Sequence, residues 1–259
     1  MEKINLLLIS FMAAMLLLSC NKKEDDNETT GTALGKVTVD IDANKNVVRG
    51  GEALLGNMLC DGWMKYAKDS LKIDVDFVLS NGGGMRFSED IHKDGIYPAG
   101  DYTTEIVDEI CAFDNNLATA KITGKQLKSI LERSVSALPA DFEGRFLQCS
   151  KELTFTADVS KQVQNLDEVT NPDNPVIIKE GERITSIKIN GENYIETATY
   201  TVLTIDYLIS GGDGYVTFKE VPEADTKKYT NYKLGFIFYL KNYSPITPVK
   251  DGRITISGM

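Results

Sequence analysis

The chain has 259 residues, of which 42% are hydrophobic and 25% are charged, and its excess of acidic side chains gives a net charge of -10. This length is enough for one sizeable globular domain. The acidic balance argues against binding of nucleic acid through a basic face. It is compatible with small anionic ligands where arginines gather locally.

The first residues are predicted to be a targeting signal rather than part of the folded domain. An apolar run over residues 4–18 follows Lys3 and closes with Leu17-Leu18-Ser19-Cys20. This run resembles a bacterial lipoprotein signal, with cleavage before Cys20 and lipidation of the Cys20 thiol. A transmembrane helix is the alternative, but about 20 apolar residues are needed to span a bilayer and this run is shorter.

We therefore expect a signal peptide over residues 1–20, a solvated tether over residues 21–34 and a folded domain over residues 35–259. The tether is rich in charged and polar residues and lacks the apolar content to pack. The protein is expected to be exported and held in the bacterial cell envelope, in the outer membrane, through its lipid anchor only. The charged segment after Cys20 also resembles the export tags of some surface-exposed lipoproteins.

The remaining cysteines and the single histidine give no metal-binding pattern. Cys60, Cys111 and Cys149 allow at most one disulfide, and no CxxC spacing of the kind that binds zinc is present. His92 lies in a charged loop without other imidazoles. We therefore expect no metal and no cofactor in this chain.

The first half of the domain alternates strands and helices. An alternating strand is predicted over residues 36–42, and a helix follows Glu52 with a buried face made by Leu55, Met58, Leu59, Gly62, Trp63 and Tyr66. A buried strand is predicted over residues 75–79, a short helix through Ile110 with a threonine cap, and a strand over residues 117–122. Thr123 is expected to cap a helix over residues 125–135.

The second half is richer in extended segments. Asn190-Gly191 predicts a hairpin turn after a strand over residues 183–189. A strand over residues 200–205 precedes a helix over residues 231–242, whose predicted inward face is Leu234, Ile237 and Phe238. This pattern predicts a mixed α and β domain without fixing its topology.

Two glycine-rich turns stand out because each follows a predicted strand. Asn81-Gly-Gly-Gly-Met-Arg86 delivers one amide and one cation, and Tyr207-Leu-Ile-Ser-Gly-Gly-Asp-Gly-Tyr215 places the carboxylate of Asp213 among three glycines. Glycine is used where the backbone takes positive φ or passes close to a ligand. Either turn alone could be an ordinary connection between two secondary-structure elements. Their presence in one chain indicates a binding site.

Several motifs, in a fixed order along the chain, resemble the C-terminal, substrate-binding domain of the 5'-nucleotidase family, which includes ecto-5'-nucleotidases and UDP-sugar hydrolases. They are Arg49 followed by Leu55-Gly56-Asn57-Met58, the Asn81–Arg86 turn, Gly100-Asp-Tyr-Thr103, Phe113, Thr123-Gly124-Lys125, Gly144-Arg-Phe-Leu-Gln148 and the segment from Tyr207 to Gly214. The resemblance covers nearly the whole chain after the tether. It implies an α+β fold arranged as a four-layer α-β-β-α sandwich.

The resemblance also implies a set of substrate-binding residues. Phe113 and Tyr207 match two aromatics that sandwich a nucleobase, and Asp213 matches a carboxylate that accepts hydrogen bonds from ribose hydroxyls. Arg49 and Arg86 match phosphate-binding arginines, a task suited to a permanently charged planar group. Asn81 matches an amide that contacts the base, while Asn115 and Gly144 border the pocket. The alternative for each residue is packing or turn formation.

The chain also departs from the family pattern. Ala112 and Asp114 flank Phe113 where the family usually has proline and glycine. Family enzymes carry an N-terminal metallophosphatase domain with two metal ions, and one histidine cannot supply such a site. No catalytic residue is therefore expected here, and hydrolysis by this chain alone is not expected.

Three interpretations remain open. The first is the nucleotide-binding half of an exported 5'-nucleotidase system, in which a separate metallophosphatase chain carries two divalent metal ions and hydrolyses the phosphate ester. The second is a lipoprotein that captures nucleotides or nucleosides without catalysis, and the third is a structural domain with a decayed pocket. The complete set of motif residues argues against the third.

Overall fold

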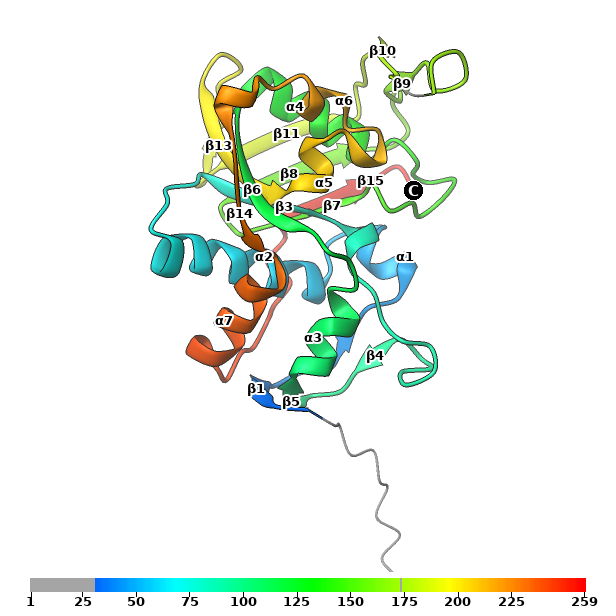
Figure 1. Ribbon diagram of the computed structural model, residues 1–259. Helices are drawn as coiled ribbons and strands as arrows, with labels where there is room; N and C mark the ends of the chain where they lie inside the picture. The colour runs from blue at the N-terminus through cyan, green and yellow to red at the C-terminus, as the bar shows by residue number, and fades with distance from the viewer. Residues whose placement is uncertain (1–30, 173) are drawn as a thin grey trace, which may run out of the picture.

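The computed structural model describes residues 31–172 and 174–259 (Figure 1). The predicted signal peptide, Cys20 and residues 21–30 of the predicted tether lie outside the described residues. No helix in the described ranges has both the length and the apolar content that a membrane crossing requires. The first strand begins at Ala33, so regular structure starts two residues before the expected start of the domain.

The centre of the molecule is a five-stranded sheet. Its order is β14 (Thr226–Asn231), β6 (Asn116–Thr123), β13 (Thr199–Ile205), β3 (Phe77–Asn81) and β7 (Leu147–Cys149). β13 runs parallel to β3, and the other pairs are antiparallel. Every residue of β3 is buried, as expected of a strand with both faces covered. Helix α2 (Leu54–Tyr66) packs against β3 and β7, and α7 (Lys233–Tyr243) packs beside α2.

A second sheet has four strands. Its order is β12 (Glu192–Asn193), β11 (Ile184–Ile189), β8 (Leu153–Asp158) and β15 (Ile254–Ser257). Alternate residues of β8 are buried, so one face of this sheet points into the core. Helix α4 (Gly124–Ser134) contacts both β6 and β11 and therefore joins the two sheets, with α6 (Val216–Lys219) beside it (Figure 1).

The remaining elements are short. Three two-stranded sheets pair β1 (Ala33–Val37) with β5 (Gly100–Thr103), β2 (Ile41–Asp42) with β4 (Ile96–Tyr97), and β9 (Asn165–Leu166) with β10 (Ile177–Lys179). Short helices and single turns are α1 (Lys45–Val48), the π turn η1 (Ala67–Leu71), η2 (Gly82–Gly84), α3 (Thr104–Ile110), α5 (Asp206–Ile209), η3 (Gly212–Gly214) and η4 (Glu223–Asp225).

The mixed α+β fold expected from the resemblance is confirmed. The predicted buried face of α2 is buried at every named position. The Asn190-Gly191 hairpin joins β11 to β12, with positive φ at both turn residues as a two-residue hairpin of this kind requires. Its second strand covers residues 192–193.

Two sequence predictions were wrong in detail. The predicted strand over residues 36–42 is two strands, because β1 pairs with β5 while β2 pairs with β4, and Asp40 between them accepts a hydrogen bond from the amide of Ala99. In α7, Leu234 is 44% exposed while Phe236 and Leu240 are buried. This helix has apolar residues on every side, so its sequence does not indicate which side faces the core.

Thr123 caps α4 through a reciprocal pair of hydrogen bonds, as the sequence predicted. Its hydroxyl accepts from the Gln126 amide at 3.2 Å, and the Gln126 side chain accepts from the Thr123 amide at 2.8 Å. Thr123→Ala should lower the free energy of unfolding by about 1 kcal/mol and the melting temperature by roughly 2–4 °C. Thr123→Ser, which keeps the hydroxyl, is the matched control in thermal unfolding. Equal melting temperatures for all three proteins would contradict a capping role.

Candidate functional site

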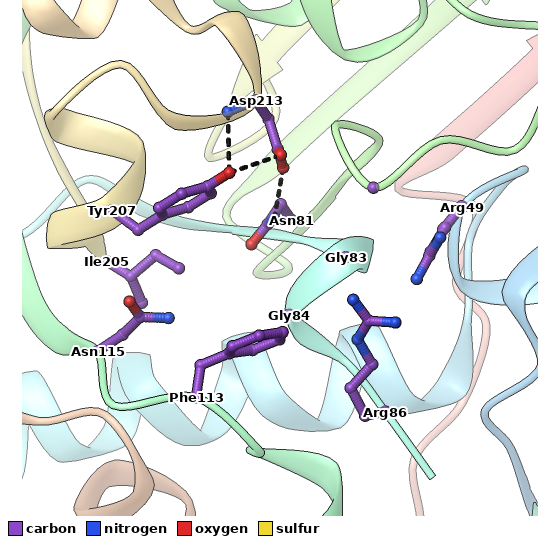
Figure 2. Close-up of a pocket in the computed structure, with 11 residues that line it drawn as sticks. Arg49, Asn81, Gly83, Gly84, Arg86, Phe113, Asn115, Ile205, Tyr207 and Asp213 are labelled. Atoms are coloured by element: carbon purple, nitrogen blue, oxygen red, sulfur yellow. Dashed lines mark hydrogen bonds between the residues drawn. The ribbon is translucent and has the colours of Figure 1, made fainter. Parts of the chain in front are cut away.

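All of the predicted substrate-binding residues line one cavity of about 310 Å³ (Figure 2). The lining is Arg49, Asn81, Gly83, Gly84, Arg86, Phe113, Asn115, Gly144, Ile205, Tyr207 and Asp213. The structure therefore brings together residues that are spread over most of the domain. Their proximity is a property of the fold, and their role toward a ligand stays a prediction.

The cavity lies where the parallel strands β3 and β13 end. Asn81 is the last residue of β3 and Ile205 is the last residue of β13, so both strands deliver their following turns to the same edge of the sheet. The carboxyl ends of neighbouring parallel strands are a common place for ligands in α/β sheets. The turn after β3 contains η2, and α5 and η3 follow β13. The remaining lining residues come from loops at the end of α1, after α3 and before β7.

Asp213 has an unusual backbone conformation. Its φ of 57° lies in the left-handed region, and Gly211 and Gly214 beside it also have positive φ. For a residue other than glycine, this conformation costs on the order of 1 kcal/mol and persists where the surroundings fix it. The flanking glycines let the chain turn sharply enough to place the Asp213 carboxylate in the cavity.

Three hydrogen bonds fix Asp213 from the cavity side (Figure 2). The amide nitrogen of Asn81 donates to one carboxylate oxygen at 2.7 Å, and the Tyr207 hydroxyl donates to the other at 2.9 Å. The backbone amide of Asp213 donates to the Tyr207 hydroxyl at 3.2 Å. Burial, followed by the hydrogen bond to Asp213 and the charge of its carboxylate, raises the pKa of the Tyr207 phenol.

The amide orientation of Asn81 leaves an acceptor in the cavity. Because its nitrogen donates to Asp213, its Oδ1 is buried without a hydrogen-bond partner among the described residues. An unpaired buried acceptor is costly, and a ligand that donates a hydrogen bond there would remove the cost.

Two aromatic rings border the cavity on opposite sides (Figure 2). Phe113 and Tyr207 are 43% and 42% exposed, which leaves both residues accessible. Tyr232 holds the loop that carries Phe113: its hydroxyl accepts from the Phe113 amide at 3.1 Å, and its own amide donates to the Asn115 carbonyl at 3.2 Å.

Arg49 and Arg86 form the cationic end of the cavity (Figure 2). The guanidinium of Arg86 lies 5.3 Å from the centre of the Phe113 ring, within cation–π range. Burial, followed by the charge of Arg86, lowers the pKa of the Arg49 guanidinium, while Asp213 acts in the opposite direction. The Nε of Arg49 is buried without a partner among the described residues.

The other arginines of the described chain have partners that these two lack. Arg133, Arg145 and Arg253 form ion pairs with carboxylates, and Arg183 donates to several backbone carbonyls. Within the described ranges, no carboxylate lies within ion-pairing distance of Arg49 or Arg86. Two neighbouring cations without a counter-ion favour an anionic ligand.

Gly144 allows the loop before β7 to approach the β3 turn closely. Its carbonyl accepts a hydrogen bond from the Gly83 amide at 2.8 Å, and an added Cβ at Gly83 would lie 2.8 Å from the Gly144 Cα. Side chains at these two positions would push the loops apart. The glycines therefore allow the β3 turn and the loop before β7 to meet at the cavity wall.

Sequence reasoning missed part of the lining. Gly83 and Gly84 lie inside the motif that the sequence singled out, but only Asn81 and Arg86 of that motif were assigned to the site. Ile205 was not assigned, although its place at the end of a predicted strand next to Tyr207 could have indicated it. Tyr232 lies outside the cavity and became evident only through its hydrogen bonds to the Phe113 loop.

The residues that the structure describes do not fit a dinuclear metal site. Among the described residues, no group of three or more histidine, cysteine, aspartate or glutamate side chains could hold a metal ion. His92 is outside the cavity lining, packs against Tyr97 with ring centres 4.4 Å apart and lies 3.7 Å from the Glu109 carboxylate. Cys60, Cys111 and Cys149 are free and buried.

Comparison with known proteins adds the family context. The family model for the 5'-nucleotidase C-terminal domain matches residues 33–220. The chain is 29% identical over 238 residues to the trifunctional nucleotide phosphoesterase protein YfkN of Bacillus subtilis, covering 90% of this chain and 14% of that protein. It is 28% identical over 249 residues to a 5'-nucleotidase-related protein of Glossina morsitans morsitans, covering 89% and 39% of the two chains.

A solved structure shows the same fold. The 5'-nucleotidase precursor of Thermus thermophilus superimposes with a TM-score of 0.70 at 26% identity, covering 88% of this chain and 40% of that one. In each comparison this chain spans less than half of the relative's length. The chain belongs to the 5'-nucleotidase C-terminal domain family.

Proposed function

We propose that this protein is the nucleotide-binding half of an exported, lipid-anchored 5'-nucleotidase system, in which a separate metallophosphatase chain carries out hydrolysis. The observation that carries the proposal is the convergence of two accessible rings, one fixed carboxylate and two unpaired guanidinium groups around a single cavity. These groups match, in order, an aromatic base, a ribose and a phosphate.

Each part of the cavity has a specific task in this proposal. A base stacks between Phe113 and Tyr207, since every nucleobase has a π face. Asp213 accepts hydrogen bonds from the ribose hydroxyls, which is why Tyr207 and Asn81 hold its carboxylate in place. Arg49 and Arg86 neutralise and orient the phosphate.

Hydrolysis is assigned to another chain because these residues do not fit a metal site. In the 5'-nucleotidase family, two metal ions activate a water for attack on the phosphorus. This chain's own residues bind and orient the nucleotide. The alternative, a lipoprotein that captures nucleotides without catalysis, uses the same cavity and differs only in the absence of a catalytic partner.

The first prediction concerns the base and ribose. Phe113→Ala should weaken adenosine binding by roughly tenfold to a hundredfold, because stacking contributes about 1–3 kcal/mol per base. Asp213→Ala should weaken it at least as much. Calorimetric titration of the purified protein measures both. Phe113→Tyr, which keeps the π face, is the matched control, and equal affinities for all of these proteins would contradict the assignment.

The second prediction concerns the phosphate. Arg86→Met should remove most of the difference in affinity between AMP and adenosine and leave adenosine binding nearly unchanged. Added salt should weaken AMP binding to the unmodified protein more than adenosine binding, since salt screens ionic contacts. Lys188→Met removes one exposed positive charge from β11 and controls for net charge. An AMP preference that survives in Arg86→Met would refute this role.

The third prediction distinguishes the nucleotide-binding half of a 5'-nucleotidase system from a lipoprotein that captures nucleotides without catalysis. Mixing this protein with a purified two-metal phosphatase chain that lacks this domain should increase AMP hydrolysis, and the rate should rise with the concentration of either chain until the complex is saturated. Phe113→Ala should reduce that rate. A hydrolysis rate that is the same with and without this protein would favour the capture function instead.

A further inference from the structure

Asp213 has a fourth anchor that lies outside the cavity lining. The Nε of Arg133, on α4, donates to the backbone carbonyl of Asp213 at 3.0 Å. The Arg133 side chain is only 6% exposed and pairs with the carboxylate of Glu168, which lies between β9 and β10. Arg133 is therefore a buried side chain that contacts the backbone of Asp213, whereas Asn81 and Tyr207 contact its carboxylate.

The fit between Arg133 and this loop is close. A side chain at Gly214 would overlap the Arg133 guanidinium, so the guanidinium lies directly against the backbone that follows Asp213. Gly214 has a φ of 77°, and Asp213 before it is also left-handed. The carbonyl between these two residues is the one that accepts the hydrogen bond from Arg133.

The ion pair with Glu168 keeps Arg133 in this orientation. Burial and the nearby charge of Arg145 both lower the pKa of Arg133, and Glu168 opposes them. Arg145 is itself held elsewhere, by Glu143 and by the Ser136 hydroxyl. Glu168 is thus the carboxylate that balances the Arg133 charge, and the segment between β9 and β10 is tied through it to the Asp213 loop.

We infer that Arg133, oriented by Glu168, is a positioning residue that sets the Asp213 carboxylate for sugar recognition. This inference rests on the proposed nucleotide-binding function. Arg133 touches no ligand and acts only through the backbone of Asp213. It fixes the carbonyl and thereby the left-handed conformation from which the carboxylate reaches Asn81 and Tyr207. Loss of Arg133 should weaken recognition of the ribose and leave base stacking between Phe113 and Tyr207 intact.

The test compares adenosine with adenine, which lacks the ribose. Arg133→Met should weaken adenosine binding by about tenfold, the effect expected for loss of one well-placed hydrogen bond, and leave adenine binding unchanged. Glu168→Gln, which changes a half-exposed side chain, should give a smaller loss of the same kind. In an Asp213→Ala background, Arg133→Met should cause no further loss, because residues that act through one another are not additive.

Arg253→Met is the matched control. Arg253 is a buried arginine with carboxylate partners, Asp61 and Asp251, and it does not line the cavity. Its replacement should lower the melting temperature without changing the ratio of adenosine to adenine affinity. If Arg133→Met and Glu168→Gln also leave this ratio unchanged, the inference is wrong. Glu168→Gln decides the question if Arg133→Met does not fold.

A second readout needs no ligand. The Tyr207 phenol donates to Asp213, so displacement of the carboxylate should lower the pKa of Tyr207 toward its ordinary value. Titration of ring-labelled tyrosine by NMR, assigned with Tyr207→Phe, measures this change. A lower Tyr207 pKa in Arg133→Met supports the inference even if adenosine does not bind, which would contradict only the proposed function. An unchanged pKa would refute the positioning role.

Discussion

The left-handed conformation of Asp213 is the constraint on which the site depends. It is held by Asn81 at the end of β3, by Tyr207 at the start of α5 and by Arg133 on α4. The contacts of Asn81 and Arg133 join segments that are 132 and 80 residues apart in the chain. Together these contacts fix one carboxylate against the local backbone preference. A conformation that costs free energy and is fixed from several sides is typical of functional sites.

The cavity contains two arginines although the protein as a whole is acidic. The chain has a net charge of -10, yet Arg49 and Arg86 meet in the cavity without a carboxylate partner within ion-pairing distance in the described part of the chain. Elsewhere, buried arginines are balanced: Arg253 by Asp61 and Asp251, and Arg133 by Glu168. The fold therefore pairs these buried guanidinium groups with carboxylates, whereas the half-buried Arg49 and the exposed Arg86 have no such pair within the described residues. A local positive field in an acidic protein favours an anionic ligand at this one place.

The residues that the sequence grouped into one site do lie around one cavity, and their role toward a ligand stays a prediction, whereas some parts of the fold were predicted wrongly. Glycine-rich turns and the residues they deliver have local signals, so Asn81, Arg86 and Asp213 could be found without a structure. The break between β1 and β2 and the buried face of α7 depend on partners far along the chain, which local patterns do not contain. Ile205, Tyr232 and Arg133 were also missed. Tyr232 and Arg133 act through neighbours distant in sequence, while Ile205 lines the cavity directly and had only its place beside Tyr207 as a local signal.

The accessibility of the two rings bears on how the site would operate. Phe113 and Tyr207 are each more than two-fifths exposed, while the groups that support them, Tyr232 and the last four residues of β13, are buried. A rigid support under exposed rings allows a base to enter with little rearrangement of the protein. The cationic end is different, since burial and the neighbouring charge of Arg86 disfavour the charged form of Arg49, and a bound anion would oppose this effect. Base stacking can therefore hold a nucleoside, whereas the arginines would increase the affinity for a ligand that also carries a phosphate. A catalytic partner would need to reach that phosphate from the side of the cavity that Arg49 and Arg86 leave open.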